Sequence, residues 1–205
     1  KILLTGATGY IGKRILPTLV NMGHEVICCV RDINRFTPPE GIIDKIEVIE
    51  VDFLNEKSLE KIPKKIDGAY YLMHSMSNSK DYETLELESA INFKNALNKS
   101  EVKHVIYLSG IINGNELSKH LNSRKAVENE LNKGTYNFTA LRAGIIIGSG
   151  SASFEIIRDL VEKLPLMITP KWLETKCQPI AVRDVITFLS KSLFNSKTFN
   201  RNFDI

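Results

Sequence analysis

The amino-acid sequence predicts an α/β fold in which a doubly wound parallel sheet is covered by helices on both faces. Two observations support this prediction. Short apolar segments recur at intervals of about 20 to 30 residues, and segments with the apolar spacing of helices lie between them. Because strand and helix alternate along the chain, we expect a three-layer α/β/α arrangement with right-handed crossovers.

The expected strands are rich in Ile, Val, Leu and Tyr. Most of them are continuously apolar, as expected where helices cover both faces of a parallel sheet. They span residues 1–5, 25–30, 46–51, 68–73, 105–109 and 137–142, and residues 200–205 read as a further strand. No cap, turn or helix follows that last strand, and no Met precedes Lys1, so we expect the natural protein to continue further.

The expected helices span residues 10–22, 82–98, 119–133 and 154–164. Gly23 and Gly134 follow the first and third of them, at the position where glycine commonly caps a helix C-terminus. Asp184 is expected near the start of a later helix, because a carboxylate is favoured there.

Size and charge favour one globular domain over residues 1–205. The chain is 43% hydrophobic and 25% charged, which is ordinary for a folded domain. Its net charge is only +3, and Lys and Arg are scattered among Asp and Glu, so a nucleic-acid partner is not expected. No apolar run is long enough for a membrane span, and we expect no membrane partner and a cytoplasmic location.

The three cysteines predict neither a disulfide nor a metal site. Cys28 and Cys29 are neighbours in an expected strand and therefore point to opposite faces, and Cys177 stands alone. No paired Cys-x-x-Cys spacing is present, so we expect no metal and interpret the cysteines as small buried apolar residues.

The most informative motif is a glycine-rich turn between the first strand and the first helix. Gly6, Gly9 and Gly12 lie within KILLTGATGYIGKRIL. One glycine permits the tight turn, another lets the backbone approach a pyrophosphate, and the third allows close packing of helix on strand. The pyrophosphate then lies on free backbone N–H groups at the positive end of the helix dipole. The turn therefore predicts a Rossmann-type dinucleotide site.

A P-loop of the nucleotide-hydrolase kind is the nearer rival, because Lys13 follows Gly12. That motif requires glycine at the position of Ala7 and Ser or Thr at the position of Arg14. The P-loop is therefore excluded.

The segment TGATGYIG resembles the extended and atypical members of the short-chain dehydrogenase/reductase superfamily. Residues 69–76, 123–131, 142–165 and 177–185 look like the bacterial NAD(P)-binding group of atypical members, the nucleoside-diphosphate-sugar epimerase-like proteins. The resemblance covers essentially the whole chain. It places Asp52 and Phe53 beside the adenine, and Ala143, Gly144 and Ile145 against the nicotinamide.

The strand ends add His74, Ser75 and Met76, because open α/β sheets bind ligands at the carboxyl ends of their strands. The residues expected to bind the cofactor are Thr5, Gly6, Thr8, Gly9, Tyr10, Ile11, Gly12, Arg31, Asp32, Asp52, Phe53, His74, Ser75, Met76, Ser109, Lys125, Ala143, Gly144 and Ile145.

The residues after the second strand favour NADP, with NAD as the alternative. An acidic residue there accepts hydrogen bonds from the ribose 2′-hydroxyl, whereas an Arg can hold a 2′-phosphate. Arg31 comes first, followed by Asp32, and Arg35 adds a positive charge nearby. Two plainer interpretations stay open, in which Arg31 pairs with Asp32 and Asp52 caps the helix that follows it.

The catalytic residues expected from the resemblance are Ser109 and Lys125. Short-chain dehydrogenases typically use Ser, Tyr and a Lys four residues after that Tyr, on one helix face. Leu121 occupies the Tyr position, and His120 beside it does not share the face of Lys125. In a plainer interpretation Lys125 is a surface residue paired with Glu128.

Two functions therefore stay open. The first is an NAD(P)H-dependent oxidoreductase or epimerase-like enzyme acting on a small organic substrate, with His74 or Tyr82 as a different acid. The second is a sensor or scaffold that binds cofactor without turnover. The expected partners are the dinucleotide, an unidentified small molecule and a second copy of the chain in a homodimer. The irregular segment around Trp172 is a candidate substrate wall.

Overall fold

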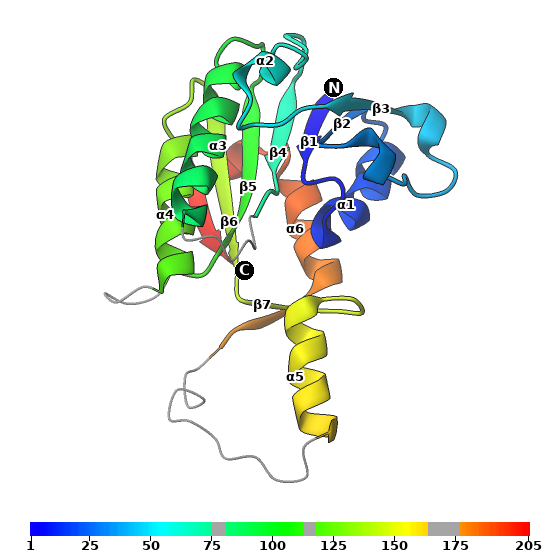
Figure 1. Cartoon of the computed structure of the whole chain (residues 1–205), viewed down its shortest axis with the longest axis vertical. Helices are drawn as coiled ribbons and strands as arrows, with labels where there is room; N and C mark the ends of the chain where they lie inside the picture. Colours follow the sequence, from blue (N-terminus) through cyan, green and yellow to red (C-terminus); the bar gives the residue numbers. More distant parts are fainter. Residues whose placement is uncertain (75–80, 113–117, 164–176) are drawn as a thin grey trace.

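The computed structural model describes residues 1–74, 81–112, 118–163 and 177–205. Strands and helices alternate along most of the chain (Figure 1). The strands are β1 (Ile2–Thr5), β2 (Val26–Val30), β3 (Ile46–Glu50), β4 (Gly68–Tyr71), β5 (His104–Gly110), β6 (Asn137–Ala143), β7 (Ile145–Ile147), β8 (Pro179–Ala181) and β9 (Arg201–Asp204). The α-helices are α1 (Tyr10–Asn21), α2 (Glu56–Leu59), α3 (Tyr82–Leu97), α4 (Lys119–Leu131), α5 (Ala152–Lys163) and α6 (Val182–Ser192).

Seven strands form one parallel sheet in the order β3-β2-β1-β4-β5-β6-β9. The order reverses between β1 and β4, where Ile2 pairs with Val26 on one side and with Gly68 on the other. Ligands of doubly wound sheets bind at such a switch point, outside the carboxyl ends of the strands. The predicted fold class is confirmed.

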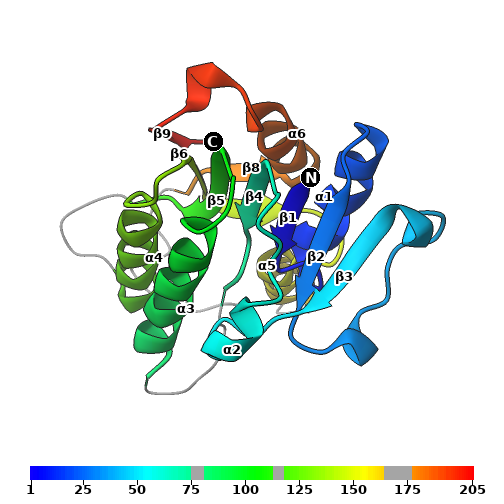
Figure 2. The same ribbon diagram turned by 90° about the horizontal axis from the view of Figure 1, so that it is seen from above.

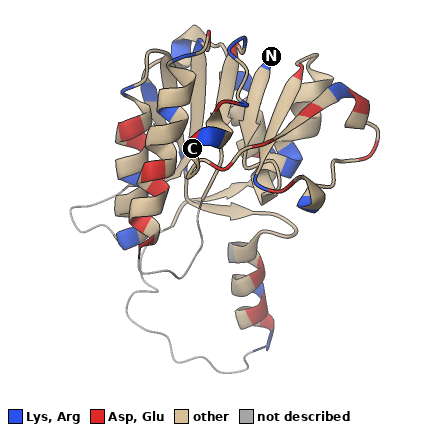
Figure 3. Cartoon of the chain, turned by 45° about the horizontal axis from the view of Figure 1, so that its top comes forward, with Lys and Arg blue, Asp and Glu red and all other residues tan. Residues whose placement is uncertain are grey.

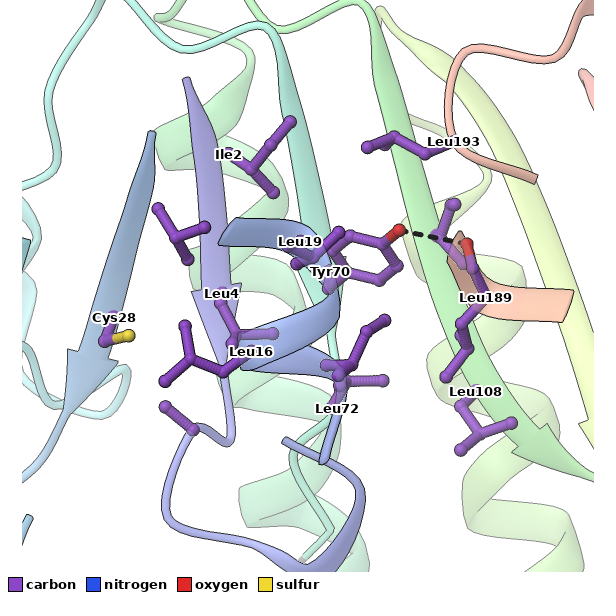
Figure 4. Close-up of a cluster of buried hydrophobic side chains, with 14 of the residues drawn as sticks. Ile2, Leu4, Leu16, Leu19, Cys28, Tyr70, Leu72, Leu108, Leu189 and Leu193 are labelled. Carbon is purple, nitrogen blue, oxygen red and sulfur yellow. Dashed lines mark hydrogen bonds between the residues drawn. The ribbon is translucent and has the colours of Figure 1, made fainter. Parts of the chain in front are cut away.

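The sheet lies between two layers of helices, with α1 and α6 on one face and α3 and α4 on the other (Figure 2). Alternate residues of each strand enter opposite cores, as strand geometry requires. On the α1 and α6 side, the hydroxyl of the buried Tyr70 donates to the carbonyl oxygen of Leu189 at 2.9 Å, which ties β4 to α6 (Figure 4). The opposite core gathers Phe53, Tyr71, Phe93, Tyr107 and Phe138.

Cys28 and Cys29 enter opposite cores as free, buried thiols, as the sequence predicted. Burial raises the pKa of the Cys28 thiol to about 12, so this group stays protonated and apolar in character. The same expectation is wrong for Cys177, which is free but exposed.

The two glycine caps have different outcomes. Gly23 has a φ of +86° directly after the cap residue of α1, which confirms the predicted left-handed cap. Gly134 is not such a cap, because α4 ends with Asn132 as its cap residue and Gly134 has no positive φ. A side chain at Gly134 would instead collide with the ring of Tyr136, so packing explains this glycine.

The segment after β6 leaves the main sheet. The break falls at Gly144, where any side chain would collide with the carbonyl oxygen of Gln178. β7 then pairs with β8, which the sequence did not predict, and α5 projects away from the body of the fold (Figure 1). α6 begins at Val182, so Asp184 lies in its first turn, as expected.

Basic and acidic residues are interspersed along the helices, as the blue and red segments of the ribbon show (Figure 3). On α5, Lys163 pairs with Asp159 at 2.6 Å, and Arg158 pairs with Glu155 and Asp159. Within the described ranges, no helix is both long enough and apolar enough to cross a membrane.

A buried histidine connects the sheet to the chain that follows α6. His104 Nδ1 accepts a hydrogen bond from the Phe194 backbone N–H at 3.0 Å, and its Nε2 lies 2.9 Å from Thr139 Oγ1. Thr139 Oγ1 itself donates to the Thr198 carbonyl at 2.6 Å, so it accepts from His104. This arrangement requires the neutral imidazole, and burial lowers the pKa of His104 to about 4.

We therefore predict that His104 makes the fold acid-sensitive. The unfolded imidazole takes up a proton below its ordinary pKa of 6.5, whereas the folded one does so only near 4. Stability is thus fully present above pH 6.5 and falls toward pH 4, at up to about 1.4 kcal/mol per pH unit. Urea unfolding between pH 7.5 and 5 measures this slope.

For the His104→Gln variant, the free energy of unfolding should depend less steeply on pH over the same range, because about one fewer proton is taken up on unfolding. His24 and His74 have lowered pKa values in both proteins, so their contribution cancels in the comparison. Equal slopes for the two proteins would contradict this assignment.

Candidate functional site

The glycine turn lies at the carboxyl end of β1 and begins the cleft. Gly6 has a φ of +68°, and a Cβ there would lie 2.5 Å from the Leu72 carbonyl oxygen. A Cβ at Gly12 would collide with the carbonyl of Gly6, so helix and turn touch through their backbones. Gly9 is exposed and lines the cleft. Gly6 thus permits the tight turn, Gly12 permits the close contact between helix and turn, and Gly9 lies open to the cleft.

The N-terminus of α1 is open to an anion. Gly9 is its cap residue, and no side chain accepts from the first amides and no acidic residue lies in the first turn. The N-terminus of α1, the positive end of its dipole, therefore borders the cleft that Thr8 and Gly9 line.

Two other residues of the predicted turn are used to hold the fold together. The buried Thr5 hydroxyl donates to the Tyr70 carbonyl at 2.9 Å and accepts from the Leu72 amide at 3.1 Å, which joins β1 to β4. Ile11 packs against the core beneath α1. The Thr5 hydroxyl is therefore engaged within the fold, and both side chains fix the position of the turn.

Tyr10 connects the turn to the segment after β7. The Arg14 guanidinium stacks 3.8 Å from the centre of the Tyr10 ring and donates to the Ser149 carbonyl at 2.7 Å. The Tyr10 hydroxyl is buried against Gly148 and has no hydrogen-bond partner among the described residues. The helix that follows the glycine turn is therefore held in place from two sides.

A cleft of about 370 Å³ runs from the turn along the carboxyl ends of β2, β3 and β4. Its lining includes Gly6, Thr8, Gly9, Arg31, Asp52, Phe53, His74 and Glu86. The structure therefore brings together predicted site residues from four separate strand ends.

The rim of the cleft after β2 presents a cation. Arg31 is exposed, and no ion pair joins it to Asp32. The Asp32 carboxylate instead accepts from the Asn34 amide at 2.9 Å and caps a short turn. The expectation that Arg31 pairs with Asp32 is wrong, and the guanidinium faces solvent beside the cleft.

The residues after β3 form one side of the cleft. Asp52 accepts from the Leu54 amide at 3.0 Å, and Asn55 rather than Asp52 caps α2, so the predicted capping role of Asp52 is wrong. Phe53 lines the cleft, but its ring is only 3% exposed and lies 5.6 Å from the ring of Phe93. Phe53 therefore shapes this wall from within the core.

His74 lies at the end of β4, where the cleft turns toward β5. Desolvation and the nearby Arg124 guanidinium lower the pKa of His74 to about 3, and its ring is hydrogen-bonded to the Leu108 backbone. The imidazole is therefore neutral at physiological pH and already has a backbone partner, which makes it a poor proton donor. Ser75 and Met76 lie outside the described residues, as does Trp172.

Ser109 occupies the end of β5, beside Tyr107. Its Oγ is buried and meets no well-oriented hydrogen-bond partner among the described residues. Burial raises the pKa of Tyr107. The nearby Ser109 hydroxyl partly offsets this rise in the pKa of Tyr107, and the hydrogen-bonding capacity that Ser109 keeps can meet a ligand atom.

The α4 helix contacts the sheet through a different face from the one expected. Lys125 is exposed, and its expected partner Glu128 is bound elsewhere, so the predicted Lys125–Glu128 pair is wrong. Glu128 accepts from Arg142 Nε at 3.0 Å and Nη2 at 2.6 Å. This buried bidentate pair fixes α4 on β6. The same placement of α4 brings Arg124 against Gly110 at the end of β5. The sequence interpretation did not include Arg124 among the site residues.

The far end of the site is built by the end of β6. Ala143 is buried, and its carbonyl accepts from the Ile111 amide at 3.3 Å. Gly144 is exposed, and Ile145 begins β7 by pairing with Pro179. These residues lie at the carboxyl end of β6.

A family model described as NAD(P)H-binding matches residues 6–163. The chain is 23% identical to a chloroplastic divinyl chlorophyllide a 8-vinyl-reductase of Arabidopsis thaliana, over 98% of this chain and 51% of the relative. It is 26% identical to a ketoreductase of Penicillium rubens, over 55% of this chain and 37% of the relative. The chain thus spans about half or less of the length of these relatives.

Solved structures show the same fold over the whole chain. A nucleoside-diphosphate-sugar epimerase of Staphylococcus aureus matches with a TM-score of 0.78 and 18% identity, covering 100% of this chain and 70% of that one. An enzyme of Bordetella bronchiseptica in complex with NAD and UDP matches with a TM-score of 0.77 and 16% identity, covering 100% and 71%.

The geometry of the turn predicts different effects for two glycine substitutions. Gly12→Ala should lower the free energy of unfolding by about 1–3 kcal/mol. The added Cβ collides with backbone atoms of Gly6 and Ala7, which cannot move aside as a flexible side chain could. Gly9→Ala should lower the free energy of unfolding by less than about 1 kcal/mol, since only the Gly6 carbonyl lies nearby, at 3.1 Å. Urea unfolding of both variants measures the difference, and equal losses would show that the close approach is not at Gly12.

Proposed function

Because the chain belongs to the NAD(P)H-binding family, we propose that it binds NADP(H) across the carboxyl edge of the sheet and takes part in redox or epimerase-like chemistry on a small organic substrate. One observation supports this most strongly. The uncapped N-terminus of α1 opens at Gly9 into a cleft that continues to Arg31 on one side and His74 on the other. A dinucleotide needs an anion site between two such branches.

The residues present fit this group. A side chain at Gly6 would collide with backbone, and the exposed Gly9 leaves the free amides of α1 open to a pyrophosphate. Asp52 and Phe53 would border the adenine, and His74, Ser109 and Ala143 to Ile145 would border the nicotinamide. The bound cofactor would supply a hydride donor or acceptor.

NADP(H) is favoured over NAD(H) by the charges after β2. The Asp32 carboxylate, which would bind a ribose 2′-hydroxyl, already accepts from the Asn34 amide. Arg31 has no carboxylate partner among the described residues, and its planar guanidinium can bind a phosphate through two N–H groups.

An alternative function is a sensor or scaffold that binds cofactor without turnover. Leu121 supports it, because this apolar side chain stands where the resemblance expects the proton-donating Tyr and packs toward Gly110. Tyr82 stays a candidate acid at the start of α3, where partial burial and the Glu83 and Glu86 carboxylates raise its pKa. Mixing the protein with NADPH and a panel of carbonyl compounds separates the two functions. Loss of the reduced-nicotinamide absorbance supports the enzyme, and tight binding without any turnover supports the sensor.

Cofactor choice gives a sharp prediction. Arg31→Ala should weaken NADPH binding about tenfold or more, because charge-assisted hydrogen bonds to the 2′-phosphate are lost, and should change NADH binding less than about twofold. Calorimetric titration measures both. Arg183→Ala removes an exposed cation from α6 and serves as the control. A wild-type preference for NADH, or an equal loss for both cofactors, would overturn the assignment to NADP.

A further inference from the structure

The second turn of α4 borders the far end of the cleft. The buried Ser123 hydroxyl donates to Glu86 Oε2 at 2.5 Å, and Glu86 on α3 lines the cleft. The residue that follows Ser123 is Arg124. The hydrogen bond from Ser123 to Glu86 therefore holds the backbone of Arg124 next to the wall of the cleft.

The Arg124 guanidinium lies over the end of β5. A side chain at Gly110 would lie 3.1 Å from Arg124 Nη1 and 3.5 Å from its Cδ, so the absence of a side chain at Gly110 makes room for this arginine. The positive charge also reaches the neighbouring strand ends, because Arg124 contributes to the lowered pKa of His74 on β4. Among the described residues, no carboxylate forms an ion pair with Arg124.

Lys125 does not share this position. One residue rotates the direction of a helical side chain by about 100°, and Lys125 is exposed whereas Arg124 is partly buried. The Glu128–Arg142 pair fixes this rotation of α4 on the sheet.

His120 lies one turn before Arg124 on the same helix face. Residues four apart are neighbours on a helix surface. The exposed His120 ring lies 5.0 Å from the ring of Tyr82 at the start of α3, the helix whose Glu86 lines the cleft. The pair His120 and Arg124 thus has the spacing of the Tyr-x-x-x-Lys pattern, displaced by one residue from Leu121 and Lys125.

We propose that Arg124, rather than Lys125, binds the nicotinamide-ribose end of the cofactor, and that His120 lies beside the nicotinamide in place of the missing tyrosine. This inference rests on the proposed function. A guanidinium presents several N–H donors in one plane, which suits two adjacent ribose hydroxyls. An imidazole can donate or accept a hydrogen bond, as the tyrosine hydroxyl would in the usual pattern.

The test compares a whole cofactor with a fragment that lacks the nicotinamide half. Wild type, Arg124→Ala, Arg124→Lys and Lys125→Ala are titrated by calorimetry with NADPH and with adenosine 2′,5′-bisphosphate, or with NADH and ADP if NADH binds more tightly. Arg124→Ala should weaken binding of the whole cofactor about tenfold or more and binding of the fragment less than twofold. Arg124→Lys keeps the charge and should recover part of the affinity.

Lys125→Ala discriminates between the two cations, since the sequence-based expectation predicts a loss for this variant and the structure predicts none. Lys191→Ala on α6 is the matched control for removing an exposed lysine. A loss for Lys125→Ala with none for Arg124→Ala would overturn the inference. An equal loss of whole cofactor and fragment in Arg124→Ala would also overturn it, because that result indicates a general disturbance of the fold.

His120 is tested by the imidazole signals of the protein in nuclear magnetic resonance, assigned with His120→Gln. The His120 signals should shift when NADPH is added and stay unchanged with the fragment, whereas those of His24 should respond to neither. Unshifted His120 signals at saturating NADPH would remove His120 from the site. If the wild type binds neither NADPH nor NADH, the proposed function is wrong. That result is distinct from the outcomes of the Arg124, Lys125 and His120 experiments.

Discussion

Helix α1 and the turn before it touch through bare backbone. A helix can approach a preceding turn this closely only where no Cβ intervenes, and Gly12 against the carbonyl of Gly6 provides that condition. The contact sets the direction of α1, and with it the direction of its free amides and dipole. The same turn touches the backbone of Leu72 at the end of β4 through Gly6. The glycine turn is therefore positioned by the two central strands of the sheet, β1 and β4.

On the face of the sheet that α3 and α4 cover, a buried ion pair sets the position of a helix. Glu128 and Arg142 join α4 to β6 through two hydrogen bonds, in surroundings where an unpaired charge would be strongly unfavourable. Such a pair adds little to net stability but allows only one rotation of the helix on the sheet. It decides which side chains of α4 reach the strand ends. The placements of α1 and α4 thus depend on two different constraints, backbone contact at α1 and a buried ion pair at α4.

Features encoded by neighbouring residues were predictable from the sequence. The order of strands and helices and the glycine turn were correct, because periodicity and the conformational freedom of glycine are local properties. Arg124 and Lys125 could not be distinguished in this way, since the choice depends on Arg142, distant in sequence, taking up Glu128. The pairing of β7 with β8 was missed for a similar reason, because Gly144 meets Gln178 only in the folded chain.

The strand order has a consequence for how the chain folds. β6 pairs with β5 on one side, and β9, which begins at Arg201, pairs with its other edge. During synthesis, the apolar β6 therefore presents an open edge while the following 57 residues, 144–200, are made. Open strand edges are prone to pairing with other chains, and parallel pairings that span long loops form slowly. The interval before β9 docks is thus when a nascent chain of this topology is most exposed to aggregation.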